Sequence, residues 1–135
     1  MKVSELMIGN LIYVEKCQQI ERVNYITTTS VGYGKGNFAP IDSILGYFNH
    51  IELTEEWLLK FGFNKDYKKG WIGIDVKHNN GTTTDFVLGE PFNMGEWQSF
   101  YAFIYNEYRF VELKYVHELQ KLYFALTGEE LEITL

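Results

Sequence analysis

The segment "YVHELQKLYFALTGEEL", from Tyr115 to Leu131, constrains the fold more than any other part of the chain. Its apolar side chains recur at the spacing of an α-helix: Val116, Leu119, Leu122, Tyr123 and Leu126. A helix with one apolar stripe must bury that stripe against another layer of structure. We therefore expect a helix that begins near Lys114, ends at Thr127-Gly128 and closes the core over a sheet.

A second helix is predicted over "LTEEWLLKFGF", from Leu53 to Phe63, because it carries start and stop signals at both ends. Thr54 is a good N-cap residue, and two glutamates follow it where the helix dipole favours negative charge. Gly62 is placed for a left-handed C-cap, with Phe63 folding back on Leu58.

Strands are predicted for most of the remaining chain, because 17% of the residues are aromatic and aromatic side chains favour sheets. Strands are expected at 11–14, 19–29 and 38–41, with a glycine-rich break, "SVGYGKGN", at 30–37. This spacing favours a small curled antiparallel sheet, and an SH3-like barrel is the preferred picture.

A β-hairpin is predicted over "GWIGIDVKHNNGTTTDFVL". A three-residue loop, Asn79 to Gly81, pairs Ile74 with Phe86 and keeps one face apolar, which a two-residue turn does not. The same register places Asp75 opposite Asp85, a like-charge pair that is unfavourable unless something neutralises it.

The fold class that follows is α+β in one compact domain, 1–135. Its strand-rich SH3-like half is expected at 1–53, and an antiparallel sheet packed by two helices at 54–135. Residues 97–113 favour two strands over one long strand, because the mean strand has only about 5–6 residues.

Composition excludes several classes of function. The formal net charge of −6 disfavours nucleic acid and anionic membrane surfaces as partners. Cys17 is the single cysteine, which excludes an internal disulfide and fits a reducing compartment. The sequence shows neither a signal peptide nor an apolar run of membrane-spanning length. A cytoplasmic protein is the resulting expectation.

Three segments, "SELMIGNLIYV", "IELTEEWLLKFGF" and "YVHELQKLYFALTGEELEI", resemble motifs of a family of small uncharacterised proteins encoded in Bacteroidetes genomes and in their phages and mobile elements. The motifs lie at both ends and in the middle of the chain. The sequence departs from the pattern at "LGYFNHIEL", where a compact "PIPL"-like approach to the helix is expected. The resemblance implies a mobile-element context, in which small proteins often bind other proteins, and it implies no activity.

Two sets of residues are candidates for a site. Asp75 and Asp85 could hold a divalent cation if they lie opposite each other, although two solvated carboxylates are the simpler interpretation. The second set comprises Trp71, Trp97, Tyr101, Tyr105 and His117. These residues would form a binding surface, and core packing is the alternative for the aromatic ones. Because His50 and His78 show no ligand spacing to His117, we expect His117 to have no catalytic role.

A non-enzymatic binding protein is the predicted function, with a protein partner or a second copy of the chain and no cofactor. The alternative is a small enzyme or a metabolite-binding protein that uses a pocket between the two halves.

Overall fold

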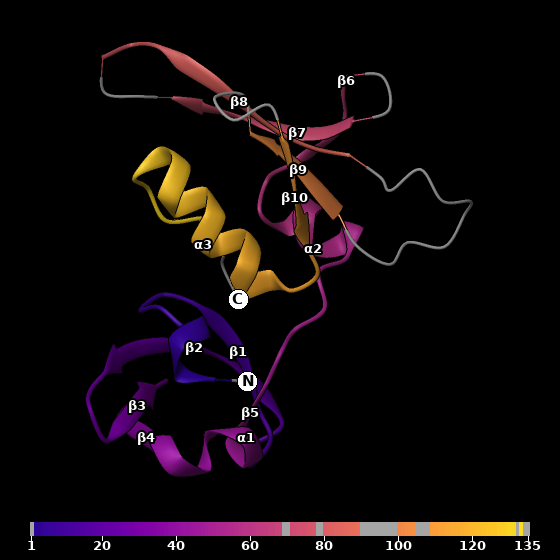
Figure 1. Ribbon diagram of the computed structural model, residues 1–135. Coiled ribbons are helices and arrows are strands. Elements are labelled where there is room, and N and C mark those ends of the chain that lie inside the picture. The colour runs from indigo at the N-terminus through magenta and orange to yellow at the C-terminus, as the bar shows by residue number, and fades with distance from the viewer. Residues whose placement is uncertain are drawn as a thin grey trace. The chain divides into compact units, whose positions relative to one another are not determined.

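The chain forms two structural units, each built on one antiparallel sheet (Figure 1). The computed structural model describes residues 2–68, 71–77, 80–89, 100–104, 109–131 and 133. The first unit comprises Met1–Glu52 and Tyr115–Lys121, and the second comprises Leu53–Lys114 and Leu122–Leu135. The predicted mixture of helices and antiparallel strands is confirmed.

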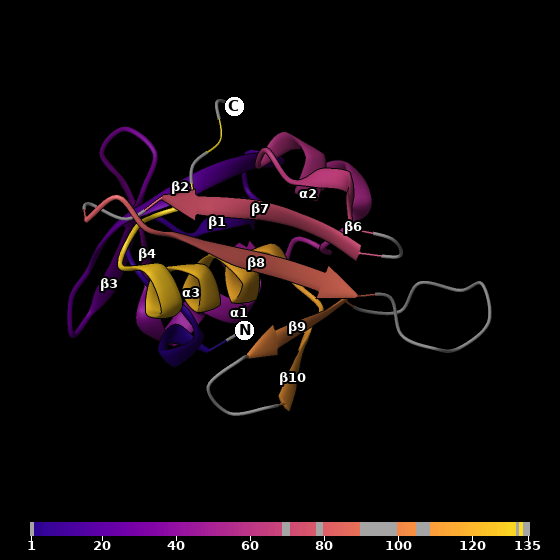
Figure 2. The same cartoon turned by 90° about the horizontal axis from the view of Figure 1, so that it is seen from above.

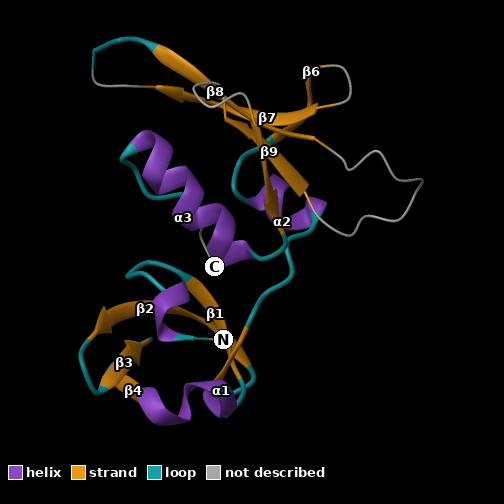
Figure 3. Ribbon diagram, viewed as in Figure 1, coloured by secondary structure: helices purple, strands orange, loops and turns teal. Residues whose placement is uncertain are grey.

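The first unit is a five-stranded sheet in the order β4-β3-β2-β1-β5. Its strands are β1 (Leu11–Val14), β2 (Gln19–Ile26), β3 (Ser30–Tyr33), β4 (Asn37–Pro40) and β5 (Phe48–Asn49). Its short helical segments are the 3-10 helices η1 (Val3–Glu5) and η2 (Ile41–Ser43), and α1 (Ile44–Tyr47). The first half of β2 pairs with β1 and the second half with β3, and the pairing with β3 shifts register between Val23 and Tyr25. Figure 3 shows that the strands of this sheet curl round on themselves.

The core of this unit consists of apolar side chains from every strand of the sheet and from the segments around it. These are Leu6, Ile12, Val14, Val23, Val31, Tyr33, Ala39, Ile44 and Phe48. The rings of Tyr33 and Phe48 meet edge to face, with centroids 5.4 Å apart, an arrangement that aromatic pairs favour.

The sequence predicts a glycine-rich loop over the whole of 30–37. This prediction is wrong for the first half of the segment, which forms β3. Gly32 lies in β3 directly opposite Tyr25 of β2, and the Tyr25 ring covers it so closely that a Cβ there would lie 2.0 Å from the ring. The ring replaces the side chain that glycine lacks, so the strand continues. The actual turn follows, with positive φ at Gly34 and Gly36.

The second unit contains a five-stranded sheet in the order β10-β9-β8-β7-β6 (Figure 2). The elements are α2 (Glu55–Lys60), β6 (Asn64–Lys68), β7 (Trp71–Lys77), β8 (Thr83–Gly89), β9 (Phe100–Ile104) and β10 (Arg109–Leu113). The expected two strands in the region 97–113 are confirmed as β9 and β10, whereas β6 was not predicted. The last helix, α3 (Val116–Thr127), contributes residues to both units.

The predicted hairpin register is confirmed. Ile74 pairs with Phe86 in β7 and β8, and Asp75 pairs with Asp85. On the apolar face, the Phe86 ring meets the rings of Phe63 and Tyr123, with centroids 6.0 and 5.5 Å away. Phe86 thus joins the sheet to the end of α2 and to the second half of α3.

The predicted signals at the two ends of α2 are also confirmed. The Thr54 hydroxyl accepts a hydrogen bond from the Trp57 backbone N–H. Gly62 has a positive φ, and the Phe63 N–H donates to the carbonyl of Leu58 as a Schellman turn requires. In α3, Val116, Leu119 and Tyr123 are buried as expected, but Leu126 is exposed, so the buried stripe ends one turn early.

Within the described parts of the chain, none of the helices combines the length and the apolar content that crossing a membrane requires.

Replacing Gly73 should destabilise the second unit. A Cβ at Gly73 would lie 2.8 Å from the Tyr67 ring and 3.0 Å from the carbonyl oxygen of Phe86. We expect Gly73→Ala to lower the free energy of unfolding by roughly 1–3 kcal/mol, measured by urea denaturation. Gly46→Ala is the matched control, because a Cβ at Gly46 meets nothing within 4 Å and the residue lies in α1. Equal effects of the two variants would contradict this account of Gly73.

Candidate metal centre

A buried glutamine attaches the start of α3 to the first unit. The Gln120 side-chain oxygen accepts from the Leu11 backbone N–H at 2.8 Å, and its amide nitrogen donates to the Gly9 carbonyl at 3.1 Å. The Lys121 ammonium group donates to the backbone carbonyl of Glu5 at 3.1 Å. These bonds join α3 to the η1–β1 region, 109 residues or more away in the sequence.

The residues just before α3 are held by a second set of backbone contacts. Tyr115 forms an antiparallel bridge with Glu52, and the Val116 N–H donates to the Ile51 carbonyl at 2.9 Å. The Glu118 carboxylate accepts from the Tyr115 backbone N–H at 3.0 Å, which caps the helix. The sequence shows no standard N-cap residue here, so this cap was not predicted.

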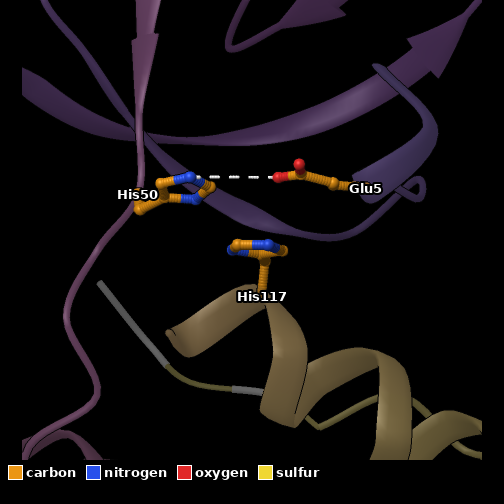
Figure 4. Close-up of side chains that lie close together, drawn as sticks. All are labelled: Glu5, His50 and His117. Atoms are coloured by element: carbon orange, nitrogen blue, oxygen red, sulfur yellow. Dashed lines mark ion pairs between the residues drawn. The ribbon is translucent and has the colours of Figure 1, made fainter. Parts of the chain in front are cut away.

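Together these contacts bring Glu5, His50 and His117 into one cluster (Figure 4). One ligand atom from each side chain lies within 4.8 Å of the other two. His50 Nε2 and Glu5 Oε2 are 3.9 Å apart. Glu5 ends η1, His50 follows β5, and His117 lies in the first turn of α3, so three separate segments supply the cluster.

The imidazole rings stack on each other and on Tyr115. The His50 and His117 centroids are 5.1 Å apart with ring planes at 16°. The Tyr115 ring lies 4.2 Å from His50 with planes at 12°. This stacking holds the two histidines side by side in the absence of any bond between them.

Both rings have a nitrogen whose hydrogen-bonding capacity is unused. The Nδ1 atoms of His50 and His117 are buried and have no hydrogen-bond partner among the described residues. Only 3% of the His117 surface is exposed. An unsatisfied buried polar group costs about 1–3 kcal/mol, so a native protein rarely retains one without a reason.

Electrostatics keep His117 in the form that a metal ion needs. Burial lowers the pKa of His117 to about 4, and neighbouring His50 acts in the same direction, while Glu118 and Glu5 partly oppose them. His117 is therefore neutral at physiological pH, and a neutral imidazole has a lone pair available for a metal ion.

The donor set is that of a transition-metal site. Imidazole nitrogens and a carboxylate bind Zn²⁺ at about 2.0–2.2 Å, which separates the donor atoms of a tetrahedral site by about 3.4 Å. The donors all lie within 4.8 Å of one another, so an inward movement of at most about 1 Å would bring them to these distances. His50 and Glu5 have the freedom to do so, because 29% and 39% of their side-chain surfaces are exposed. Because the ring planes of His50 and His117 lie only 16° from parallel, the His50 ring must also rotate before both rings can direct a lone pair at one ion.

His50 shows no ligand spacing to His117 in the sequence, but the structure brings the two side chains together. Glu5 and His50 are far from His117 in the sequence and form no motif with it. No spacing rule could have found the cluster. The one available signal was the position of His117 beside Val116 and Leu119, on the face of the helix that was expected to be buried.

The carboxylate pair predicted in the second unit is also present, with a partner that was not foreseen. The Tyr67 hydroxyl of β6 lies within hydrogen-bonding distance of both Asp75 and Asp85. These hydrogen bonds, that to Asp75 foremost, raise the pKa of Tyr67. The hydroxyl carries one proton and can donate to only one carboxylate at a time. The Tyr67 hydroxyl is thus a hydrogen-bonding partner that the two carboxylates share.

The remaining candidate residues lie only partly within the described residues. Trp71 pairs with Gly89, and its ring covers that glycine, so a packing role accounts for it. The backbone of Tyr101 lies in β9 opposite Glu112 of β10. Trp97 and Tyr105 lie outside the described residues. A common aromatic binding surface formed by these side chains therefore stays a prediction.

No protein-family model matches the chain, and neither a curated protein nor a solved structure is significantly similar to it. The assignment of a function therefore depends on the geometry and chemistry of the clusters themselves.

The depressed pKa of His117 predicts how stability changes with pH in metal-free protein. Below the ordinary pKa of 6.5, unfolded His117 binds a proton, whereas folded His117 stays neutral down to about pH 4. The free energy of unfolding should therefore fall as pH decreases through this window. Between pH 7 and 5 the contribution is roughly 1 kcal/mol, after allowance for solvent screening.

His117→Phe, which keeps an aromatic ring at this position, should remove that contribution. Urea denaturation in the presence of a chelator would show the stability of the wild type decreasing relative to the variant between pH 7 and 5. Parallel pH profiles for the two proteins would contradict the assignment of a neutral, buried His117.

Proposed function

We propose that this protein binds a divalent transition-metal ion in its first unit, through Glu5, His50 and His117. The observation that carries the proposal is a buried His117 whose Nδ1 has no hydrogen-bond partner among the described residues. It lies next to a carboxylate and to a second histidine whose Nδ1 is likewise buried and unpaired there. An ion bound there would satisfy one nitrogen of each ring and neutralise the carboxylate.

The chemistry of the donors favours particular ions. Imidazole suits Zn²⁺, Cu²⁺, Ni²⁺ and iron, whereas Mg²⁺ and Ca²⁺ prefer sites built from oxygen atoms alone. Zn²⁺ is the appropriate first probe, because it imposes no strong geometric preference of its own. An ion at 100 times its dissociation constant would stabilise the folded state by about 2.7 kcal/mol.

Zn²⁺ titration should show one strong site. We expect isothermal titration calorimetry on the full chain to give a 1:1 complex, and native mass spectrometry to show one retained ion. Each of His117→Ala and His50→Ala should weaken binding more than about 100-fold, because even residues that only support ligands contribute 10–100-fold.

Asp85→Asn is the matched control, because it alters the other acidic cluster and should leave Zn²⁺ binding unchanged. Binding that survives His117→Ala, or that is lost in Asp85→Asn, would refute the assignment. A stoichiometric response to Mg²⁺ or Ca²⁺ that Asp85→Asn removes would instead place a cation at Asp75 and Asp85.

The fold of the first unit is part of the proposal. An SH3-like barrel is supported by the curled five-stranded sheet, in which β5 returns to pair with β1 after a short helical segment. A reducing, cytoplasmic location is supported by Cys17, which is exposed and has no second cysteine in the chain.

A second candidate function, association between copies of the chain, is favoured by an exposed aromatic pair on the sheet of the first unit. Tyr25 and Phe38 lie on strands on either side of Gly32, and both pair with it. Phe38 is 60% exposed, which is unusual for a phenylalanine in a sheet. The resemblance to proteins of phages and mobile elements also favours binding to another protein molecule, because small proteins of such elements often bind other proteins.

Native mass spectrometry tests this second function in the same experiment. If copies associate through the aromatic pair, the wild type should be oligomeric and Phe38→Ser should shift it to monomer. Leu59→Ser is the control, because Leu59 is a similarly exposed apolar residue on α2. A monomeric wild type, or dissociation by both variants alike, would remove the candidate.

A further inference from the structure

We propose that an ion held by Glu5, His50 and His117 keeps a coordination position open to solvent and binds a small anion there. This inference rests on the metal binding proposed above and states what the site would bind in addition to the metal.

The number of protein donors leaves room for another ligand. Within the described residues, the cluster of histidine, cysteine and acidic side chains consists of Glu5, His50 and His117, with one ligand atom each. Zn²⁺ and its neighbours in the periodic table take at least four ligands. Sites that supply three protein ligands complete the set with water or an exogenous molecule, whereas closed structural sites supply four.

The burial of the donors shows from which side that ligand would arrive. His117 is at the closed side, because the residue is only 3% exposed. His50 and Glu5 are at the open side, with 29% and 39% of their side-chain surfaces exposed. Figure 4 shows His117 on α3 facing the other two side chains. The open position therefore lies on the side of Glu5 and His50.

The charge around the site favours an anion as that ligand. A divalent ion bound by two neutral imidazoles and one carboxylate forms a complex with a net charge of about +1. The Lys121 ammonium group is held next to the cluster by its hydrogen bond to the Glu5 carbonyl. The nearby Glu118 carboxylate opposes it but is engaged by the Tyr115 N–H. The expected ligand is a small carboxylate, phosphate, azide or hydroxide ion.

Co²⁺ in place of Zn²⁺ makes the inference measurable, because the visible spectrum of Co²⁺ reports the number and type of its ligands. We expect the full chain to bind one Co²⁺ with a visible spectrum that His117→Ala abolishes. Addition of sodium azide should change that spectrum in a saturable way, while the protein retains its Co²⁺ through a desalting column.

Lys121→Gln and Lys121→Arg form a matched pair for the role of charge. In protein loaded with Co²⁺, Lys121→Gln should weaken azide binding roughly fivefold, because one nearby positive charge is lost. Lys121→Arg should restore azide binding close to that of the wild type, because it restores the charge.

The failures of the two proposals are distinguishable. A Co²⁺ spectrum that azide does not alter would mean that the protein fills every position, so the open site would be refuted while metal binding stands. Removal of Co²⁺ by azide would refute the open site in the same way. Absence of bound Co²⁺, or binding that persists in His117→Ala, would refute the metal site itself.

Discussion

The hydrogen bonds of Gln120 are the interaction on which the candidate metal centre depends. The Gln120 amide bonds to the Leu11 N–H and the Gly9 carbonyl, so it takes the place of a neighbouring strand beside the start of β1. A buried amide without these partners would cost about 1–3 kcal/mol, which makes this attachment of α3 specific. His117 lies one turn earlier on the same helix face, so the same attachment brings His117 to Glu5 and His50.

The two clusters of titratable groups differ in the hydrogen bonds that their side chains form. In the second unit, the Tyr67 hydroxyl lies within hydrogen-bonding distance of both Asp75 and Asp85. In the first unit, stacking brings His50 and His117 together while their Nδ1 atoms have no hydrogen-bond partner among the described residues. The carboxylates of the second unit thus share a hydrogen-bonding partner, whereas the described residues supply none to the Nδ1 atoms of the two histidines. For this reason the histidine cluster, and not the expected carboxylate pair, is the better candidate for a metal ion.

Glycine accounts for part of the high aromatic content of the chain. Three aromatic rings each cover a glycine on an adjacent strand: Tyr25 on Gly32, Tyr67 on Gly73, and Trp71 on Gly89. Aromatic rings placed this way shield the backbone and supply the packing that glycine cannot. Composition alone favoured either a core or a binding surface for these residues, and for Trp71 the structure provides a packing explanation. The exposed ring of Phe38 has no such explanation.

The sequence by itself determined the features that depend on near neighbours. The caps of α2, the end of α3 at Gly128 and the pairing of Asp75 with Asp85 follow from local turn chemistry and from the alternation of one hairpin. Strand β3 escaped prediction because Gly32 is compatible with a strand only when a ring from β2 covers it. The histidine cluster escaped prediction because its members come from η1, the end of β5 and α3, which no sequence period connects. Only tertiary structure brings them together, through the bonds of Gln120 and the backbone pairing of Glu52 with Tyr115.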